Sequence, residues 1–227
     1  MLLNEQVVRE NLRNRDGKRV FYLSKGDQLT SCARDFLNRE RIDILSADQA
    51  RPERYQLLGG GYLEEKPEHM THLNGEILVS KSHPRILFRG KLDTLEAELI
   101  LCQLAAEHLL TPVGEILTQT RQLIRSDVLE EPVPEGKLCG LTEAEIRGRS
   151  HFPQKYYGQP HFMPDAADGA IMARLNRARC AAREAELAAA AAFCDREGNP
   201  TRVDILRALN RMSSMLYLLM IQEKRSN

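Results

Sequence analysis

The sequence predicts a mainly α protein in which a helix bundle follows a small α/β segment. From Pro84 onward, apolar residues recur at steps of three and four, which is the spacing of one helix face. Residues 168–193 are dominated by alanine, the best helix former, and residues 203–221 form another strongly apolar helical stretch. Several helices without intervening strands are typical of a bundle.

The N-terminal segment mixes helical and extended patterns. Residues 5–13 are amphipathic, and Thr30 stands where its side chain can cap a helix through Leu37. Residues 19–23 and 42–45 are rich in β-forming side chains, so each predicts a strand.

Changes in composition divide the chain into domains. The stretch 51–68 contains three consecutive glycines, two prolines and many charges, which predicts a loop-like linker. We therefore expect a small α/β unit over 1–50 and a helical-bundle domain over 69–225. Within the bundle, Pro112 stands where a second helix can begin, and Thr142 opens a short helix inside a Pro- and Gly-rich excursion.

Charge, hydropathy and cysteine usage exclude several classes of protein. Lys and Arg total 32 and Asp and Glu total 32, which argues against a protein that binds nucleic acid through overall positive charge. No apolar run approaches the roughly 20 residues of a membrane span, and the N-terminus lacks the apolar core of a signal peptide. We expect a soluble, cytoplasmic chain without a membrane or nucleic-acid partner. The 5 cysteines are scattered and never form Cys-x-x-Cys, so we predict no metal site.

Two arginines stand one turn apart on the alanine-rich helix. Arg179, Arg183 and Glu186 lie at i, i+4 and i+7, on one face. Guanidinium groups held that close repel unless a carboxylate or an anion lies between them, and their forks match phosphate oxygens. Asp93, on the first long helix, or Glu186 can neutralise one arginine while the other holds a phosphate. A solvated face with ion pairs between successive turns is the alternative.

The last helix carries polar residues on a mostly apolar surface. Apolar side chains wrap most of its circumference, which predicts a central, well-covered helix. Asn210 and Ser214 would then be buried and would need partners, which a bound ligand can supply. The residues alone therefore predict a bundle with an internal polar cluster able to bind an anion.

Several motifs over residues 66–222 resemble the cobalamin adenosyltransferase family. Lys81-Ser-His-Pro-Arg85, with Gly90 and Asp93 after it, is similar to the family signature Lys-Asp-Asp-Pro-Arg and the Gly-Val-Asp-Glu-Leu that follows. The spacing Arg-x-x-x-Arg-x-x-Glu and the run Asn-Arg-Met-Ser-Ser resemble two further family motifs. The ethanolamine-utilisation branch fits best, on the runs that begin at Lys66, His161 and Asp204.

The resemblance implies a five-helix bundle, usually trimeric, with ATP in a cleft between neighbouring subunits. It implies a corrinoid adenosyltransferase that moves the 5′-deoxyadenosyl group of ATP onto Co(I) of cobalamin, in ethanolamine utilisation. The implied small molecules are ATP, Mg²⁺ and cobalamin. The implied partners are other copies of the chain, as a homotrimer or another homo-oligomer, a cobalamin reductase and the proteins of a bacterial microcompartment.

The resemblance also assigns catalytic roles to four positions. Arg183 would grip phosphate oxygens, and Asp93 would pair with Arg179 across the subunit boundary and fix the cleft. Glu186 would orient this network.

Further positions would bind the substrates. Lys66, Thr71 and Lys81 would lie near the triphosphate, and Asn210 would contact the nucleotide. Phe162 is the candidate for an aromatic wedge that displaces the lower axial base of the corrin, and an ordinary core phenylalanine is the alternative.

Two departures from the family pattern bear on the site. Relatives of the ethanolamine type carry a histidine and a Cys-Cys-x-x-Cys motif before the Lys-Pro segment, whereas residues 56–66 here contain no cysteine. We therefore predict no bound iron or zinc. Ser214 replaces the aspartate of the last helix, which removes a charge. A non-catalytic nucleotide- or corrinoid-binding subunit or scaffold of a microcompartment is the competing hypothesis.

Overall fold

A computed structural model describes residues 2–15, 18–46 and 55–226. The chain divides into two compact units, Met1–Pro67 and Glu68–Asn227. Each unit is described by itself. Within the described residues, no helix is both long enough and apolar enough to cross a membrane.

The first unit is a small α/β assembly. Strand β3 pairs with β2 in antiparallel and with β5 in parallel register, β1 pairs in parallel with β4, and β6 pairs in antiparallel with β7. Its core joins Val8, Phe21, Ala33, Phe36 and Leu37. The elements are β1 (Leu2–Leu3), α1 (Glu5–Glu10), β2 (Arg13–Arg15), β3 (Lys18–Leu23), β4 (Gln28–Leu29), α2 (Ser31–Arg39), β5 (Asp43–Ser46), β6 (Tyr55–Leu57) and β7 (Tyr62–Leu63).

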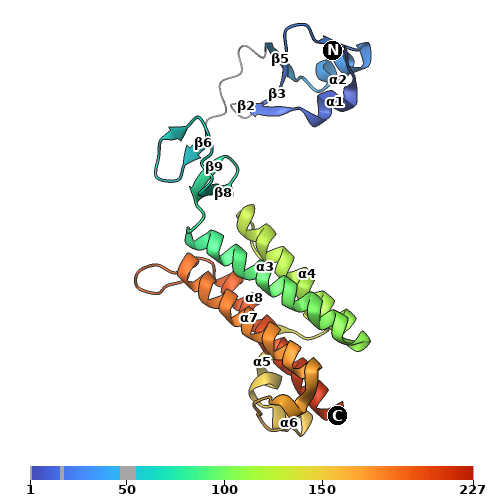
Figure 1. The fold of residues 1–227 in the computed structure, drawn as a ribbon, viewed down its shortest axis with the longest axis vertical. Helices are drawn as coiled ribbons and strands as arrows, with labels where there is room; N and C mark the ends of the chain where they lie inside the picture. Colours follow the sequence, from blue (N-terminus) through green and yellow to red (C-terminus); the bar gives the residue numbers. More distant parts are fainter. Residues whose placement is uncertain (1, 16–17, 47–54, 227) are drawn as a thin grey trace. The chain divides into compact units, whose positions relative to one another are not determined.

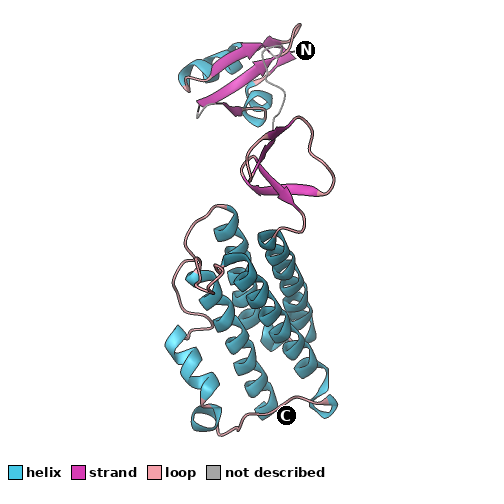
Figure 2. Cartoon of the chain, turned by 90° about the vertical axis from the view of Figure 1, so that its left-hand side faces the viewer, coloured by secondary structure: helices cyan, strands magenta, loops and turns pink. Residues whose placement is uncertain are grey.

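The second unit begins with a β-hairpin and continues as a helical bundle (Figures 1 and 2). The hairpin turns at Gly75, whose φ of 50° lies in the left-handed region that favours glycine. The long helices α3, α4, α7 and α8 pack together, and the shorter α5 packs on α8. The elements are β8 (Met70–Asn74), β9 (Ile77–Ser80), α3 (Pro84–Ala105), α4 (Leu110–Val128), α5 (Glu143–His151), α6 (Pro153–Tyr157), α7 (Gly169–Phe193) and α8 (Val203–Ser226).

Helix α7 lies between α3 and α8 and packs against both. Its alanines at 178, 181, 182, 185 and 189 are at most 1% exposed. Small side chains let helix axes approach closely, which explains why alanine dominates this helix. Helices α3 and α7 run antiparallel, because Lys91 Nζ lies 2.9 Å from Glu184 Oε2 while Arg177 Nε lies 3.2 Å from Glu98 Oε1.

The mainly α class with an N-terminal strand-containing segment is confirmed. Thr30 caps α2 by accepting from the Ala33 amide, and Thr142 forms a capping box with Glu145. The second bundle helix begins at Leu110, two residues before the predicted start at Pro112.

Some short strands were not predicted. The stretch 51–68, predicted as a loop, contains β6 and β7 in its described part, and residues 51–54 lie outside the described residues. The β8–β9 hairpin directly before α3 was also missed. These strands are only two to five residues long, too short for a clear period-2 pattern.

Candidate functional site

The two predicted arginines of α7 differ in their surroundings. The Arg179 guanidinium is half-buried and donates from Nε and Nη2 to Asn176 Oδ1, at 3.1 and 3.0 Å. Arg183 is exposed, and in the described part of the chain its side chain has no hydrogen bond or ion pair. Arg179 is therefore oriented by its own helix, whereas the whole donor fork of Arg183 is available to a ligand.

Asp93 is exposed on α3 and pairs with neither arginine within the described chain. The arginine of α7 that bonds to a carboxylate of α3 is Arg177 instead, through Glu98. The prediction of an Asp93–Arg179 pair across a subunit boundary concerns two copies, so it stays a prediction.

Glu186 and Asn210 are brought together between α7 and α8. Asn210 Nδ2 donates to Glu186 Oε1 at 3.1 Å, and Arg211 Nη2 donates to Asn210 Oδ1 at 2.6 Å. These two contacts fix which way the Asn210 amide points. Burial lowers the pKa of Arg211, and the nearby charges of Arg147 and Arg207 lower it further.

The predicted triphosphate residues Thr71 and Lys81 lie on the hairpin and just after it. Thr71 is half-buried on β8 opposite Val79, and the exposed Lys81 donates its backbone N–H to His69 O at 2.9 Å. Lys66 is exposed at the end of the first unit.

Along the bundle, the hairpin and the arginines of α7 stand apart. The bond between Lys91 and Glu184 sets Arg183, the neighbour of Glu184, level with the first half of α3. Lys91 lies seven residues after the start of α3 at Pro84, so it is about 10 Å along the helix axis. Lys81 and Arg183 therefore lie at different levels along the bundle axis.

Phe162 is docked on the last helix. Its ring stacks on Tyr217 at a centroid distance of 5.9 Å, and its backbone N–H donates to the Tyr217 hydroxyl at 3.4 Å. His161 stacks on the same tyrosine at 5.8 Å. The predicted role of Phe162 in displacing the axial base stays a prediction.

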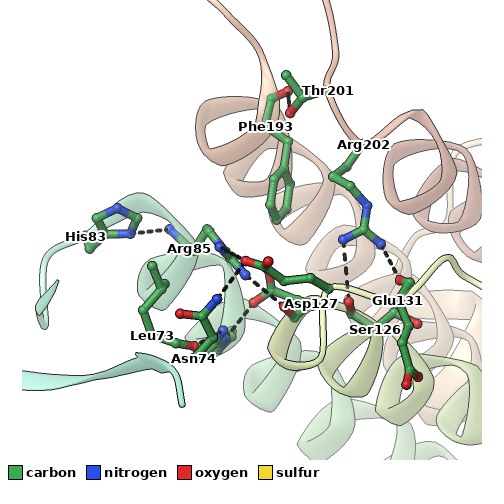
Figure 3. Close-up of polar contacts among 12 residues, drawn as sticks. Leu73, Asn74, His83, Arg85, Ser126, Asp127, Glu131, Phe193, Thr201 and Arg202 are labelled. Atoms are coloured by element: carbon green, nitrogen blue, oxygen red, sulfur yellow. Dashed lines mark hydrogen bonds and ion pairs between the residues drawn. The ribbon is translucent and has the colours of Figure 1, made fainter. Parts of the chain in front are cut away.

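A buried carboxylate, Asp127, organises the end of the bundle next to the hairpin (Figure 3). Its side chain is fully buried and lies 2.8 Å from Arg85 Nε and 2.6 Å from Arg89 Nε. A buried charge is stable only when it is paired and hydrogen-bonded, and two guanidinium groups meet that need here. Sequence reasoning missed this cluster. The available signal was a single acidic residue next to the apolar positions Leu123 and Ile124 of an amphipathic helix.

Two further groups complete this region. His83 caps α3 through Nδ1, which accepts from the Arg85 amide at 3.2 Å. Burial lowers the pKa of His83 and the charge of Arg85 adds to the effect, so the ring stays neutral and Nδ1 stays an acceptor. Arg202 donates to Ser126 O and Glu131 O, at 3.4 and 2.9 Å, and so satisfies carbonyls at the end of α4.

Two cavities lie away from the predicted residues. One, of about 70 Å³, is lined by residues that include Gln119, Asp204 and Arg211, and the other, of about 280 Å³, lies beside His108 and Glu223. None of the predicted site residues lines either cavity. Among the described residues, no group of three or more His, Cys, Asp or Glu side chains could hold a metal ion.

Comparison with known proteins defines the class. Residues 61–223 match the family described as cobalamin adenosyltransferase, and the chain belongs to this family. The resemblance drawn from the sequence motifs is thereby confirmed.

Individual relatives share one name. The chain is 30% identical over 243 residues to the corrinoid adenosyltransferase EutT of Salmonella typhimurium, covering 96% of this chain and 91% of that protein. It is 37% identical over 158 residues to the corrinoid adenosyltransferase EutT of Escherichia coli K12, covering 69% of this chain and 59% of that protein.

Proposed function

We propose that this chain is a corrinoid adenosyltransferase that transfers the 5′-deoxyadenosyl group of ATP to Co(I) of cobalamin, for ethanolamine utilisation. The observation that carries the proposal is the contrast between Arg179 and Arg183. One guanidinium is held by Asn176, and the other is exposed with its whole fork available, in a segment that matches the family. A free guanidinium fork suits the oxygens of a triphosphate.

In the proposed reaction, the Co(I) electron pair attacks C5′ of ATP. The C5′–O5′ bond breaks, its electrons leave with the polyphosphate oxygen, and the cobalt becomes Co(III) with a cobalt–carbon bond. An external reductant, such as a cobalamin reductase, must supply Co(I). The nucleophile belongs to the substrate, so the chain needs to position the reactants, stabilise the leaving charge and exclude water. This explains why the proposed site needs no general base.

The roles of the side chains follow from this chemistry. Arg183 grips the phosphate oxygens, Thr71 and Lys81 bind the triphosphate, and Asn210 contacts the nucleoside in the orientation that Glu186 sets. Mg²⁺ prefers phosphate oxygens and water to a protein cage, so it would accompany ATP and draw few ligands from the chain.

We further propose that a second copy of the chain completes the site, in a trimer of five-helix bundles in which α5 is the fifth helix. The start of α3, next to the hairpin, and the level of Arg183 are about 10 Å apart along the helix axis, so a triphosphate bound by both Lys81 and Arg183 of one chain would have to span this offset, whereas a second copy can supply one of the two side chains. Large apolar side chains also point outward on α3 and α7: Leu87, Leu104 and Leu187 are 56%, 78% and 72% exposed. Asp93 of one copy would then pair with Arg179 of the next.

Mixing the purified protein with ATP, Mg²⁺ and chemically reduced cobalamin tests the proposal. We expect the absorbance spectrum of adenosylcobalamin to appear. If neither adenosylcobalamin formation nor ATP binding is detected, the proposal is wrong, and a scaffold role in a microcompartment becomes the better account.

A further inference from the structure

Each of the three guanidinium nitrogens of Arg85 donates a hydrogen bond to a protein acceptor. Its Nε donates to Asp127 Oδ1 at 2.8 Å, its Nη1 to Glu130 Oε1 at 3.1 Å and its Nη2 to the Asp127 backbone oxygen at 2.8 Å. Although Arg85 stands only four residues after Lys81, its guanidinium is therefore held toward Asp127 and Glu130, and its side chain is only 16% exposed.

Arg89 connects Asp127 to the β8–β9 hairpin. Its Nε donates to Asp127 Oδ2 at 2.6 Å, and its Nη2 donates to the backbone oxygen of Leu73 on β8 at 2.7 Å. The side chain is only 16% exposed. A second connection runs from Asn74 Nδ2 to Glu130 Oε1, at 2.7 Å. The two connections therefore contact adjacent residues of β8, Leu73 and Asn74.

Fixing β8 at Leu73 and Asn74 also fixes the residues that the proposed function needs. Thr71 lies two residues before Leu73 on the same strand, opposite Val79 of β9. The ladder continues to the backbone bond between Lys81 and His69. A strand held at one end and paired along its length moves as a unit, so the position of Thr71 and Lys81 on the bundle depends on the Asp127 cluster.

We propose that Asp127 is a positioning residue for the nucleotide. It holds Arg85 and Arg89 in fixed orientations, and through Arg89 it sets the place of the β8–β9 hairpin, so that Thr71 and Lys81 meet the triphosphate already in position. Neither arginine of the cluster is itself a phosphate ligand. This inference rests on the proposed function for its substrate, but the hairpin's dependence on Asp127 does not.

The test compares Asp127→Asn with a matched control, Glu96→Gln. Glu96 also pairs α3 with α4, because its Oε2 lies 3.0 Å from Arg121 Nε, and this pair joins the two helices without involving the hairpin. Asn keeps the shape of Asp127 and loses the charge and one acceptor. If the hairpin is competent only about a tenth of the time in Asp127→Asn, the KM for ATP rises about tenfold. In Asp127→Asn, the KM for cobalamin should stay near the wild-type value. In Glu96→Gln, the KM for ATP and the KM for cobalamin should both stay near their wild-type values.

Hydrogen exchange provides a readout that does not need activity. In Asp127→Asn, the amides of residues 70–80 should exchange faster while those in the middle of α7 keep their protection. If Asp127→Asn does not fold, Arg89→Lys is the second variant, because it keeps the charge but lacks the guanidinium fork whose Nε and Nη2 reach Asp127 and Leu73 at once.

The outcomes separate the two proposals. An inactive wild-type protein overturns the proposed function, and exchange over residues 70–80 then still decides whether Asp127 holds the hairpin. An active wild type with an unchanged KM for ATP and unchanged exchange in the variants overturns the positioning role. An equal rise in both KM values, with exchange faster throughout the bundle, also overturns it, because Asp127 would then act only on stability.

Discussion

Replacing Arg183 with alanine should lower the activity strongly and leave the stability unchanged. Replacing Arg177 with alanine should lower the stability slightly and leave the activity unchanged. Both are exposed arginines on α7, six residues apart, and both changes delete the same side chain. Arg183 has no partner within the described chain, whereas Arg177 lies 3.2 Å from Glu98 and 3.1 Å from Glu184.

The magnitudes follow from these contacts. A hydrogen bond to a charged group contributes about 1.5–3 kcal/mol, so losing a phosphate contact in the transition state lowers kcat/KM by roughly 10- to 160-fold. The free energy of unfolding of Arg183→Ala should stay within about 0.5 kcal/mol of wild type. Arg177→Ala gives up exposed ion pairs worth about 0.2–1 kcal/mol and should keep near-normal turnover.

The assay is the rate of adenosylcobalamin formation over a range of ATP concentrations, with urea unfolding measured on the same preparations. Near-normal turnover by Arg183→Ala would refute the phosphate assignment. An equal loss of turnover in Arg177→Ala would show that the charge of α7, rather than the free fork of Arg183, is what matters.

Two further predictions concern association and pH. Asp93→Asn should weaken subunit association and lower activity, because it removes the charge proposed to pair with Arg179 of the next copy. Analytical ultracentrifugation measures the association, and a variant that associates normally contradicts that pairing. The hydrogen bonds from Arg202 lower the pKa of Asp204 from 3.8 to about 2, against the effect of burial. A carboxyl whose pKa is lowered in the folded state stabilises the protein at pH values above its ordinary pKa. This stabilisation is lost as the pH falls toward the pKa of the folded state. Asp204→Asn should therefore lower the free energy of unfolding by about 1–2 kcal/mol at pH 7, after allowance for partial exposure, and the difference from wild type should shrink between about pH 4 and pH 2. A difference that does not change over that range would argue against this linkage.

Periodicity predicted the long helices well, because their apolar faces extend over many turns. The alanine run of α7 and the apolar surface of α8 lie where the sequence placed them, and the caps at Thr30 and Thr142 form as expected. Short strands such as β8 and β9 carry too few residues to show an alternating pattern, and their pairing depends on contacts distant in sequence.

The candidate site was predicted in part. Glu186 and Asn210 meet because α7 and α8 pack together, which the two apolar helices already suggested. Asn210 and Ser214 were predicted to be buried but are half-buried, and Asn210 has protein partners, Glu186 and Arg211. The Asp127 cluster was missed because Asp127 comes 42 residues after Arg85 and 38 residues after Arg89, on another helix. Spacing within one helix cannot reveal contacts between helices.

Complementation between two defective variants tests the shared site most directly. Lys81→Ala and Arg183→Ala chains, each with strongly lowered activity alone, are co-expressed and purified as mixed oligomers through different affinity tags. If ATP lies between copies, some interfaces carry both native side chains, and adenosylcobalamin formation returns to a measurable fraction of wild type. If mixed oligomers form and their activity stays as low as that of the separate variants, each site lies within one chain and the account of a shared site is contradicted.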